Sequence, residues 1–149
     1  MKRLLILVLL LGLAAAVLPA QSNQLVDRML EDEGADVGDA TYMVLLSAGA
    51  IEESASTSDA VSYAQEQGWL EQATADSEPI TFGQFSYILM EAHGEAGGLM
   101  YRMIPGPRYA GREVVFRNWT IERRTTNEEI SGETALRILG NYLAAREAE

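Results

Sequence analysis

Apolar residues recur with the same spacing at three points of the chain. The three sets are Val37, Tyr42, Leu45, Leu46; Ile80, Phe85, Ile88, Leu89; and Ile130, Ala135, Ile138, Leu139. In each set the last three residues are spaced i, i+3, i+4, which brings them onto one face of a helix. The pattern therefore predicts three related helices, each with one buried stripe.

Polar residues just before two of the stripes indicate where the helices start. Thr81 and Ser131 follow an apolar residue and precede the stripe by four positions, which suits a helix N-cap. Thr81 and Gln84 also have the spacing of a capping box. Gly49 is placed to end the first helix in a left-handed conformation. The expected striped helices span about 39–48, 82–92 and 131–146.

A shorter amphipathic segment precedes each striped helix, at about 23–30, 60–67 and 108–119. The β-branched and aromatic residues near 113–121 leave a short strand open as an alternative to a helix there. We expect an all-α fold, a compact bundle of helix-loop-helix pseudo-repeats. Its units span about 23–50, 58–94 and 108–146.

The first twenty residues have the features of an export signal. Lys2 and Arg3 precede an apolar run from residue 4 to 17, and Leu18-Pro19-Ala20 closes it before polar residues begin. The apolar run is shorter than the roughly 20 residues of a spanning helix, so cleavage after Ala20 is favoured over an uncleaved anchor. We expect one exported domain at 21–149, periplasmic or at the cell surface, with no stable membrane span after cleavage. Cysteine is absent, so the domain depends on its core rather than on disulfides.

Charge is unevenly distributed along the chain. After removal of residues 1–20, nine arginines face 22 acids, and eight of those arginines lie beyond residue 100. So strong a negative balance excludes nucleic acid as a partner, because a phosphate backbone is bound by clustered cations. The C-terminal third is the part that can bind an anion.

The repeat unit resembles the S-layer homology family. The resemblance rests on residues 60–69, Ala-Val-Ser-Tyr-Ala-Gln-Glu-Gln-Gly-Trp, and on Ile80-Thr81-Phe82-Gly83-Gln84-Phe85. It implies a three-unit module that holds exported proteins to cell-wall polysaccharide. The family's glycan-binding arginine, two residues after the isoleucine, is replaced here by Phe82 in the middle unit, Gly132 in the last and Asp39 in the first. Its glutamate, two positions further on, is replaced by Gln84, Thr134 and Thr41.

One cluster of residues suits an anionic ligand, and we expect it to form the binding site: Arg108, Arg112, Trp119, Arg123 and Arg124. Guanidinium groups pair with carboxylate or phosphate, and an aromatic ring can stack on a sugar. The alternative is that these arginines, together with Arg117, pair with the acidic first two-thirds of the same chain or lie on a solvated face.

No catalytic constellation, cofactor or metal site is expected. His93 is the only histidine and has no neighbouring nucleophile motif, so a structural role at a helix end is favoured. The predicted function is a non-catalytic envelope domain that binds cell-wall polysaccharide or peptidoglycan, or an envelope protein. The alternative is a structural or assembly subunit of an envelope complex without glycan binding, docking through an apolar edge near residues 99–104.

Overall fold

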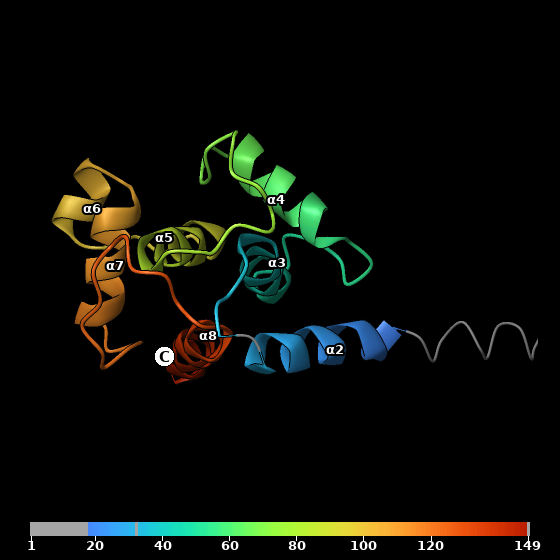
Figure 1. The fold of residues 1–149 in the computed structure, drawn as a ribbon. Helices are drawn as coiled ribbons and strands as arrows, with labels where there is room; N and C mark the ends of the chain where they lie inside the picture. Colours follow the sequence, from blue (N-terminus) through green and yellow to red (C-terminus); the bar gives the residue numbers. More distant parts are fainter. Residues whose placement is uncertain (1–17, 32, 149) are drawn as a thin grey trace, which may run out of the picture.

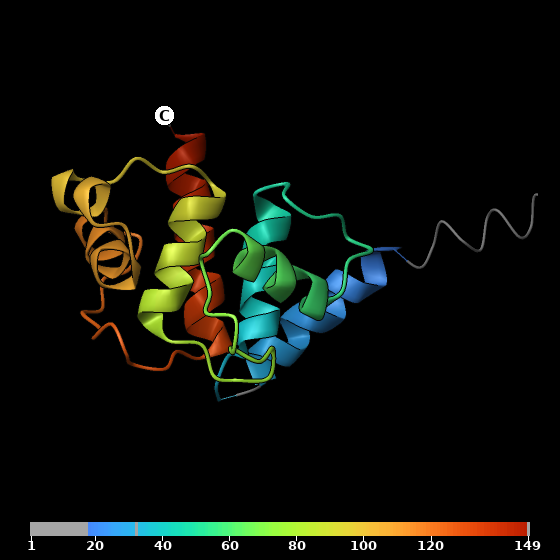
Figure 2. The same ribbon diagram turned by 90° about the horizontal axis from the view of Figure 1, so that it is seen from above.

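The computed structural model describes residues 18–31 and 33–148, and Figures 1 and 2 show their helices from two directions. Within these residues there are seven helices and no strand, which confirms the all-α prediction. The helices are α2 (Leu18–Glu31), α3 (Val37–Ser47), α4 (Thr57–Glu66), α5 (Phe82–Ala92), α6 (Leu99–Met103), α7 (Pro107–Phe116) and α8 (Gly132–Glu147).

The strand considered near 113–121 does not form, because residues 107–116 are helical and pack on α5. Pro107 occupies the first turn, where its fixed φ favours a helix and its missing N–H is not needed. Ala110 and Val114 are then four residues apart and fully buried. This buried helical stripe outweighs the β propensity of the residues around Val115.

The predicted caps of the second and third striped helices are confirmed. Thr81 accepts a hydrogen bond from the Gln84 N–H at 3.3 Å, and the Gln84 side chain accepts one from the Thr81 N–H at 3.0 Å. Ser131 accepts from the Thr134 N–H at 3.2 Å. These bonds satisfy amides that have no partner within a helix, so α5 and α8 begin directly after them.

The three striped helices begin around a closed ring of backbone hydrogen bonds. The Ala35 N–H donates to the Ile130 carbonyl at 2.9 Å, the Ile130 N–H to Ile80 at 3.2 Å, and the Ile80 N–H to Ala35 at 2.8 Å. Each of these residues precedes the N-cap of α3, α5 or α8. The three units are therefore related by an approximate threefold arrangement.

This ring corrects the alignment of the first unit. Ala35, not Val37, is the counterpart of Ile80 and Ile130, and α3 starts at Val37 rather than at Asp39. The apolar spacing misplaced the register by two residues because α3 is buried on most of its surface. A helix buried all round has no single stripe that defines its rotation.

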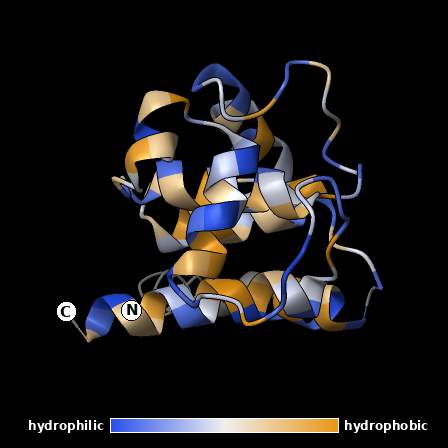
Figure 3. Ribbon diagram, turned by 90° about the vertical axis from the view of Figure 1, so that its left-hand side faces the viewer, coloured by the Kyte–Doolittle hydropathy of each residue, from blue (hydrophilic) through white to orange (hydrophobic). Residues whose placement is uncertain are grey.

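The first helices of the three units, α2, α4 and α7, pack in a cyclic order. α4 packs on α3, α7 packs on α5, and α2 packs on α8, so each covers the striped helix of the preceding unit. Figure 1 shows α6 and α7 to the left of α5, α4 above α3, and α2 beside α8 at the bottom of the molecule. In Figure 3 apolar and polar stretches alternate along the helices, as expected when each helix has one buried face.

Most of the predicted signal at 1–20 lies outside the described residues. Only its last three residues are described, and they begin α2, so the predicted cleavage point falls in the first turn of that helix. None of the helices within residues 18–31 and 33–148 is both long and apolar enough to cross a bilayer.

A candidate anion-binding groove

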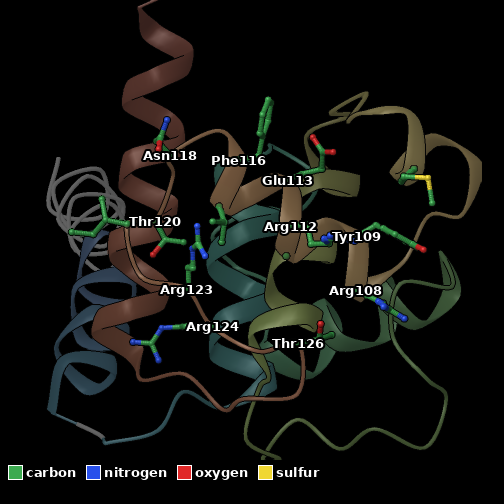
Figure 4. Close-up of a pocket in the computed structure, with 14 residues that line it drawn as sticks. Arg108, Tyr109, Arg112, Glu113, Phe116, Asn118, Thr120, Arg123, Arg124 and Thr126 are labelled. Atoms are coloured by element: carbon green, nitrogen blue, oxygen red, sulfur yellow. The ribbon is translucent and has the colours of Figure 1, made fainter.

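Four of the five predicted site residues line one open groove of about 920 Å³. Arg108 and Arg112 come from α7, whereas Arg123 and Arg124 come from the connector between α7 and α8. Figure 4 shows the two pairs on opposite sides of the groove, with Phe116 at one end. Residues 15 positions apart in sequence are thus brought to one surface.

The packing of α7 on α5 decides which side of α7 faces the groove. Gly111 lies so close to Phe82 that a Cβ there would be 3.0 Å from the Phe82 ring. Ala110 and Val114 are fully buried on the same side. Arg108 and Arg112, four residues apart, therefore share an outward face of the helix.

The connector is held by its own hydrogen bonds. Asn118 adopts a left-handed φ of 59° and ends α7. Glu128 accepts hydrogen bonds from the Arg124 guanidinium at 2.7 Å and from the Thr125 N–H at 3.1 Å. Arg124 also pairs with Glu122. These contacts give Arg124 a role in fixing the connector, in addition to its place on the groove wall.

Three groove arginines have no acidic partner among the residues that the structure describes: Arg108, Arg112 and Arg123. The expected pairing with the first two-thirds of the chain is found for Arg117, which lies 2.8 Å from Glu95, whereas Arg124 pairs with Glu122 and Glu128 of its own connector. The guanidinium carbon of Arg108 lies over the Tyr109 ring, 5.9 Å from its centroid. The groove thus carries positive charge that the described part of the chain does not neutralise.

The prediction that Trp119 belongs to the binding site is wrong, because Trp119 does not line the groove. Its side chain is buried and packs edge-on against Tyr142, with 4.7 Å between the ring centroids. Its carbonyl accepts a hydrogen bond from Asn141 at 3.0 Å, and Arg117 lies over its ring. An indole enclosed in this way cannot stack on a sugar, so Trp119 belongs to the core.

The groove also has apolar walls that sequence reasoning missed. Met100, Phe116 and Ile121 line it, and the last two are 81% and 92% exposed. Met100 belongs to the apolar edge expected near residues 99–104, whereas no sequence pattern marked Phe116 and Ile121 as exposed. A comparison within the repeat could have found them, because the residues 50 positions earlier, Glu66 and Glu71, are acidic and exposed.

His93 lies outside the groove in a hydrogen-bonded cluster. Arg146 can only donate, so the His93 Nδ1 at 3.2 Å accepts, and the proton of the neutral ring is on Nε2, 3.1 Å from Ser47 Oγ. Burial, and secondly the Arg146 charge, lower the pKa of His93, while Glu95 opposes this. Burial and a hydrogen bond to Glu95 raise the pKa of Tyr142 to about 12. These contacts join α3, α5 and α8 and involve no groove residue.

No protein-family model, curated protein sequence or solved structure matches the chain. Within the described residues, no group of three His, Asp or Glu side chains is placed to hold a metal ion. The groove is therefore the feature of the molecule that points to a function.

Proposed function

We propose that this chain is an exported, non-catalytic domain of the cell envelope that binds an anionic wall polymer through the arginine groove. The resemblance to S-layer homology modules suggests the location. The groove supplies the binding chemistry that the missing motif arginine would have supplied. Arg108, Arg112 and Arg123 are the binding residues, and Arg124 positions the connector.

The observation that carries this proposal is the unpaired state of Arg108, Arg112 and Arg123 among the described residues. The chain has twice as many acids as cations, so partners for three exposed arginines are abundant in its composition. Yet these three side chains line one groove whose single lining carboxylate, that of Glu113, lies 3.7 Å from Arg117 and pairs with none of them. Guanidinium groups arranged in this way suit carboxylates or phosphates repeated along a polymer. Tyr109 adds an aromatic ring at the groove wall.

Sedimentation with purified cell-wall sacculi tests the proposal. The wild-type protein is expected to sediment with the sacculi at low salt and to be released by about 1 M salt, because exposed charges are then screened. The double variant Arg112→Ala, Arg123→Ala should lose most of this retention. Arg137→Ala is the matched control: it removes the same kind of charge from α8, from an arginine paired with Glu122 and outside the groove.

Two results would refute polymer binding. The first is no sedimentation of the wild-type protein with sacculi at any salt concentration. The second is equal loss of retention in the groove variant and in Arg137→Ala, which would show that total charge rather than the groove matters.

A second candidate is a structural or assembly subunit, and the exposed side chains of α6 favour it. Leu99 is 70% exposed, Met103 67%, and Ile104, just after the helix, 55%. An apolar edge of this kind is typical of a protein-docking surface. Under this function the variant Leu99→Ser, Met103→Ser loses chemical cross-links to envelope proteins, while retention on sacculi is absent even in the wild-type protein.

A further inference from the structure

Exposed apolar side chains are concentrated at one end of the molecule. Of the seven large apolar residues that are exposed among the described residues, six lie on α6, at its C-terminal end, at the end of α7 and in the connector that follows. They are Leu99, Met100, Met103, Ile104, Phe116 and Ile121. The seventh, Leu30, lies elsewhere, on α2, and is 54% exposed.

Leu30 lies among acidic side chains. Asp27 and Glu31 are three residues before and one residue after it on α2, and Glu33 follows the helix. All three acids are exposed, and none makes an ion pair with a described residue. Because Asp27, Leu30 and Glu31 are spaced i, i+3, i+4, they share one face of α2. We call these four residues the α2 acidic end.

The groove and the α2 acidic end are complementary in both charge and polarity. The groove has three unpaired arginines beside Met100, Phe116 and Ile121. The α2 acidic end has three unpaired acids beside one exposed leucine. Opposite charges that surround apolar contacts are the arrangement found at specific protein interfaces.

We infer that the α2 acidic end of one copy of this chain docks into the groove of a second copy. The two surfaces lie on different elements, so the contact is head-to-tail. In such a pair one copy keeps a free groove and the other keeps a free α2 acidic end, so the assembly can grow. The inference rests on the proposed function to the extent that it uses the same anion-binding groove, and wall polymer then competes with self-assembly.

Net charge gives this contact an unusual dependence on salt. The whole chain has a formal net charge of −11, so two copies repel each other at long range. Screening lengths are about 30 Å at 0.01 M salt, about 8 Å at 0.15 M and about 3 Å at 1 M. At 0.01 M salt the long-range repulsion between two negatively charged molecules is hardly screened and opposes association. At 1 M salt the attraction between the arginines and acids of the contact is screened as well, which also weakens association. Association should therefore be strongest near 0.15 M.

Sedimentation velocity of the purified protein at these three salt concentrations tests the inference. The sedimentation coefficient should rise with protein concentration most steeply at 0.15 M. Glu31→Lys with Leu30→Ser should weaken association at least tenfold, and Arg112→Glu with Arg123→Glu should do the same. Glu66→Lys is the matched control, because it reverses an exposed acid on α4 and should leave association unchanged.

Mixing the two defective variants gives the sharpest result. One retains an intact groove and the other an intact α2 acidic end, so a mixture should form one-to-one complexes that do not grow. Absence of these complexes, a monomeric wild-type protein at all salt concentrations, or equal loss in Glu66→Lys would each overturn the inference.

Retention on sacculi separates this inference from the proposed function. The variant Glu31→Lys, Leu30→Ser should still sediment with sacculi, because its groove is intact. If the wild-type protein binds sacculi but never self-associates, the head-to-tail contact is wrong and polymer binding stands. If the protein self-associates through the groove but does not sediment with sacculi, polymer binding is wrong and the head-to-tail contact stands.

Discussion

Residues 57–81 and 107–131 have the same backbone course and differ in nearly all of their exposed side chains. Each segment starts with a ten-residue helix, α4 or α7. The Trp69 N–H then donates to the Ala64 carbonyl at 2.8 Å, and the Trp119 N–H to the Val114 carbonyl at 3.0 Å. Gly68 and Asn118 both have positive φ. Each of these features of residues 107–131 lies 50 positions after its counterpart in residues 57–81.

Buried positions are similar in the two segments. Ala60 and Ala110 are both fully buried, and so are Ala64 and Val114. Ile80 and Ile130 occupy equivalent places in the ring of hydrogen bonds. The fold requires these residues, since each packs against the striped helix of the preceding unit.

Exposed positions differ in a consistent direction. Where α4 and its connector carry Ser62, Glu66, Glu71 and Ala73, α7 and its connector carry Arg112, Phe116, Ile121 and Arg123. The first segment shows that this backbone needs neither cations nor apolar groups on its outer face. The cationic and apolar groove is therefore an addition to the scaffold, and binding is its simplest explanation.

The largest expected difference in stability between the two segments comes from replacing their tryptophans, Trp69 and Trp119. Trp119 is enclosed against Tyr142, so Trp119→Ala should lower the free energy of unfolding by about 3–5 kcal/mol. Trp69 is half-buried and contacts Tyr63 edge-on, so Trp69→Ala should cost only about 1–2 kcal/mol. Urea unfolding of both variants measures this. Equal losses would mean that Trp119 is not more deeply packed than Trp69.

A smaller difference in stability is expected from substitutions at Gly38 and Gly83, where the connector of each segment contacts the first turn of α3 or α5. A Cβ at Gly83 would lie 2.9 Å from the Thr126 carbonyl oxygen and 2.4 Å from its methyl group, whereas one at Gly38 would lie 3.1 Å from Asp76. Gly83→Ala should therefore destabilise by about 2 kcal/mol. Gly38→Ala should cost less than about 1 kcal/mol, because alanine's helix propensity offsets the tighter contact. Thermal unfolding that ranks the two variants in the opposite order would contradict this packing.

A pH effect is expected at His93, whose counterpart 50 residues later is the non-titrating Leu143. The pKa of His93 is lowered in the folded state, so the unfolded chain binds a proton first as the pH falls. The contribution of neutral His93 to stability is fully present above about pH 6.5 and is lost as the pH falls toward the folded pKa. Wild-type stability should thus fall more between pH 7.5 and 5 than that of His93→Gln. Parallel pH profiles from urea unfolding would exclude this role.

The smallest effect on stability is expected from exchanging exposed groove residues for their α4 counterparts. Arg112→Ser with Arg123→Ala should change the free energy of unfolding by less than about 0.5 kcal/mol, because neither arginine has a partner among the described residues. The same variant should lose polymer binding. A large loss of stability would mean that these arginines serve the fold.

Sequence periodicity predicted the striped helices where one face is buried and the caps are local. The capping residues Thr81 and Ser131 identified the starts of α5 and α8, because the hydrogen bonds involved span three residues. The register of α3 could not be predicted, since a helix buried on most sides has no distinct stripe. The ring through Ala35 depends on contacts between distant residues that no local pattern encodes.

Residue type and proximity in sequence predicted the arginines of the groove but not its walls. Arg108, Arg112, Arg123 and Arg124 do come together. Trp119 was misplaced because an aromatic residue beside arginines is equally compatible with a core and with a ligand surface. Phe116 and Ile121 were missed because apolar side chains are usually buried, and their exposure follows from tertiary packing.

The two segments share one scaffold, and we propose that only residues 107–131 bind an anionic polymer. Amide chemical shifts of the isotope-labelled protein, titrated with fragments solubilised from sacculi, test this most directly. We expect shifts across residues 107–126 that disappear at high salt, with residues 57–76 unchanged. Equal shifts in both segments, or shifts in 57–76 alone, would contradict it.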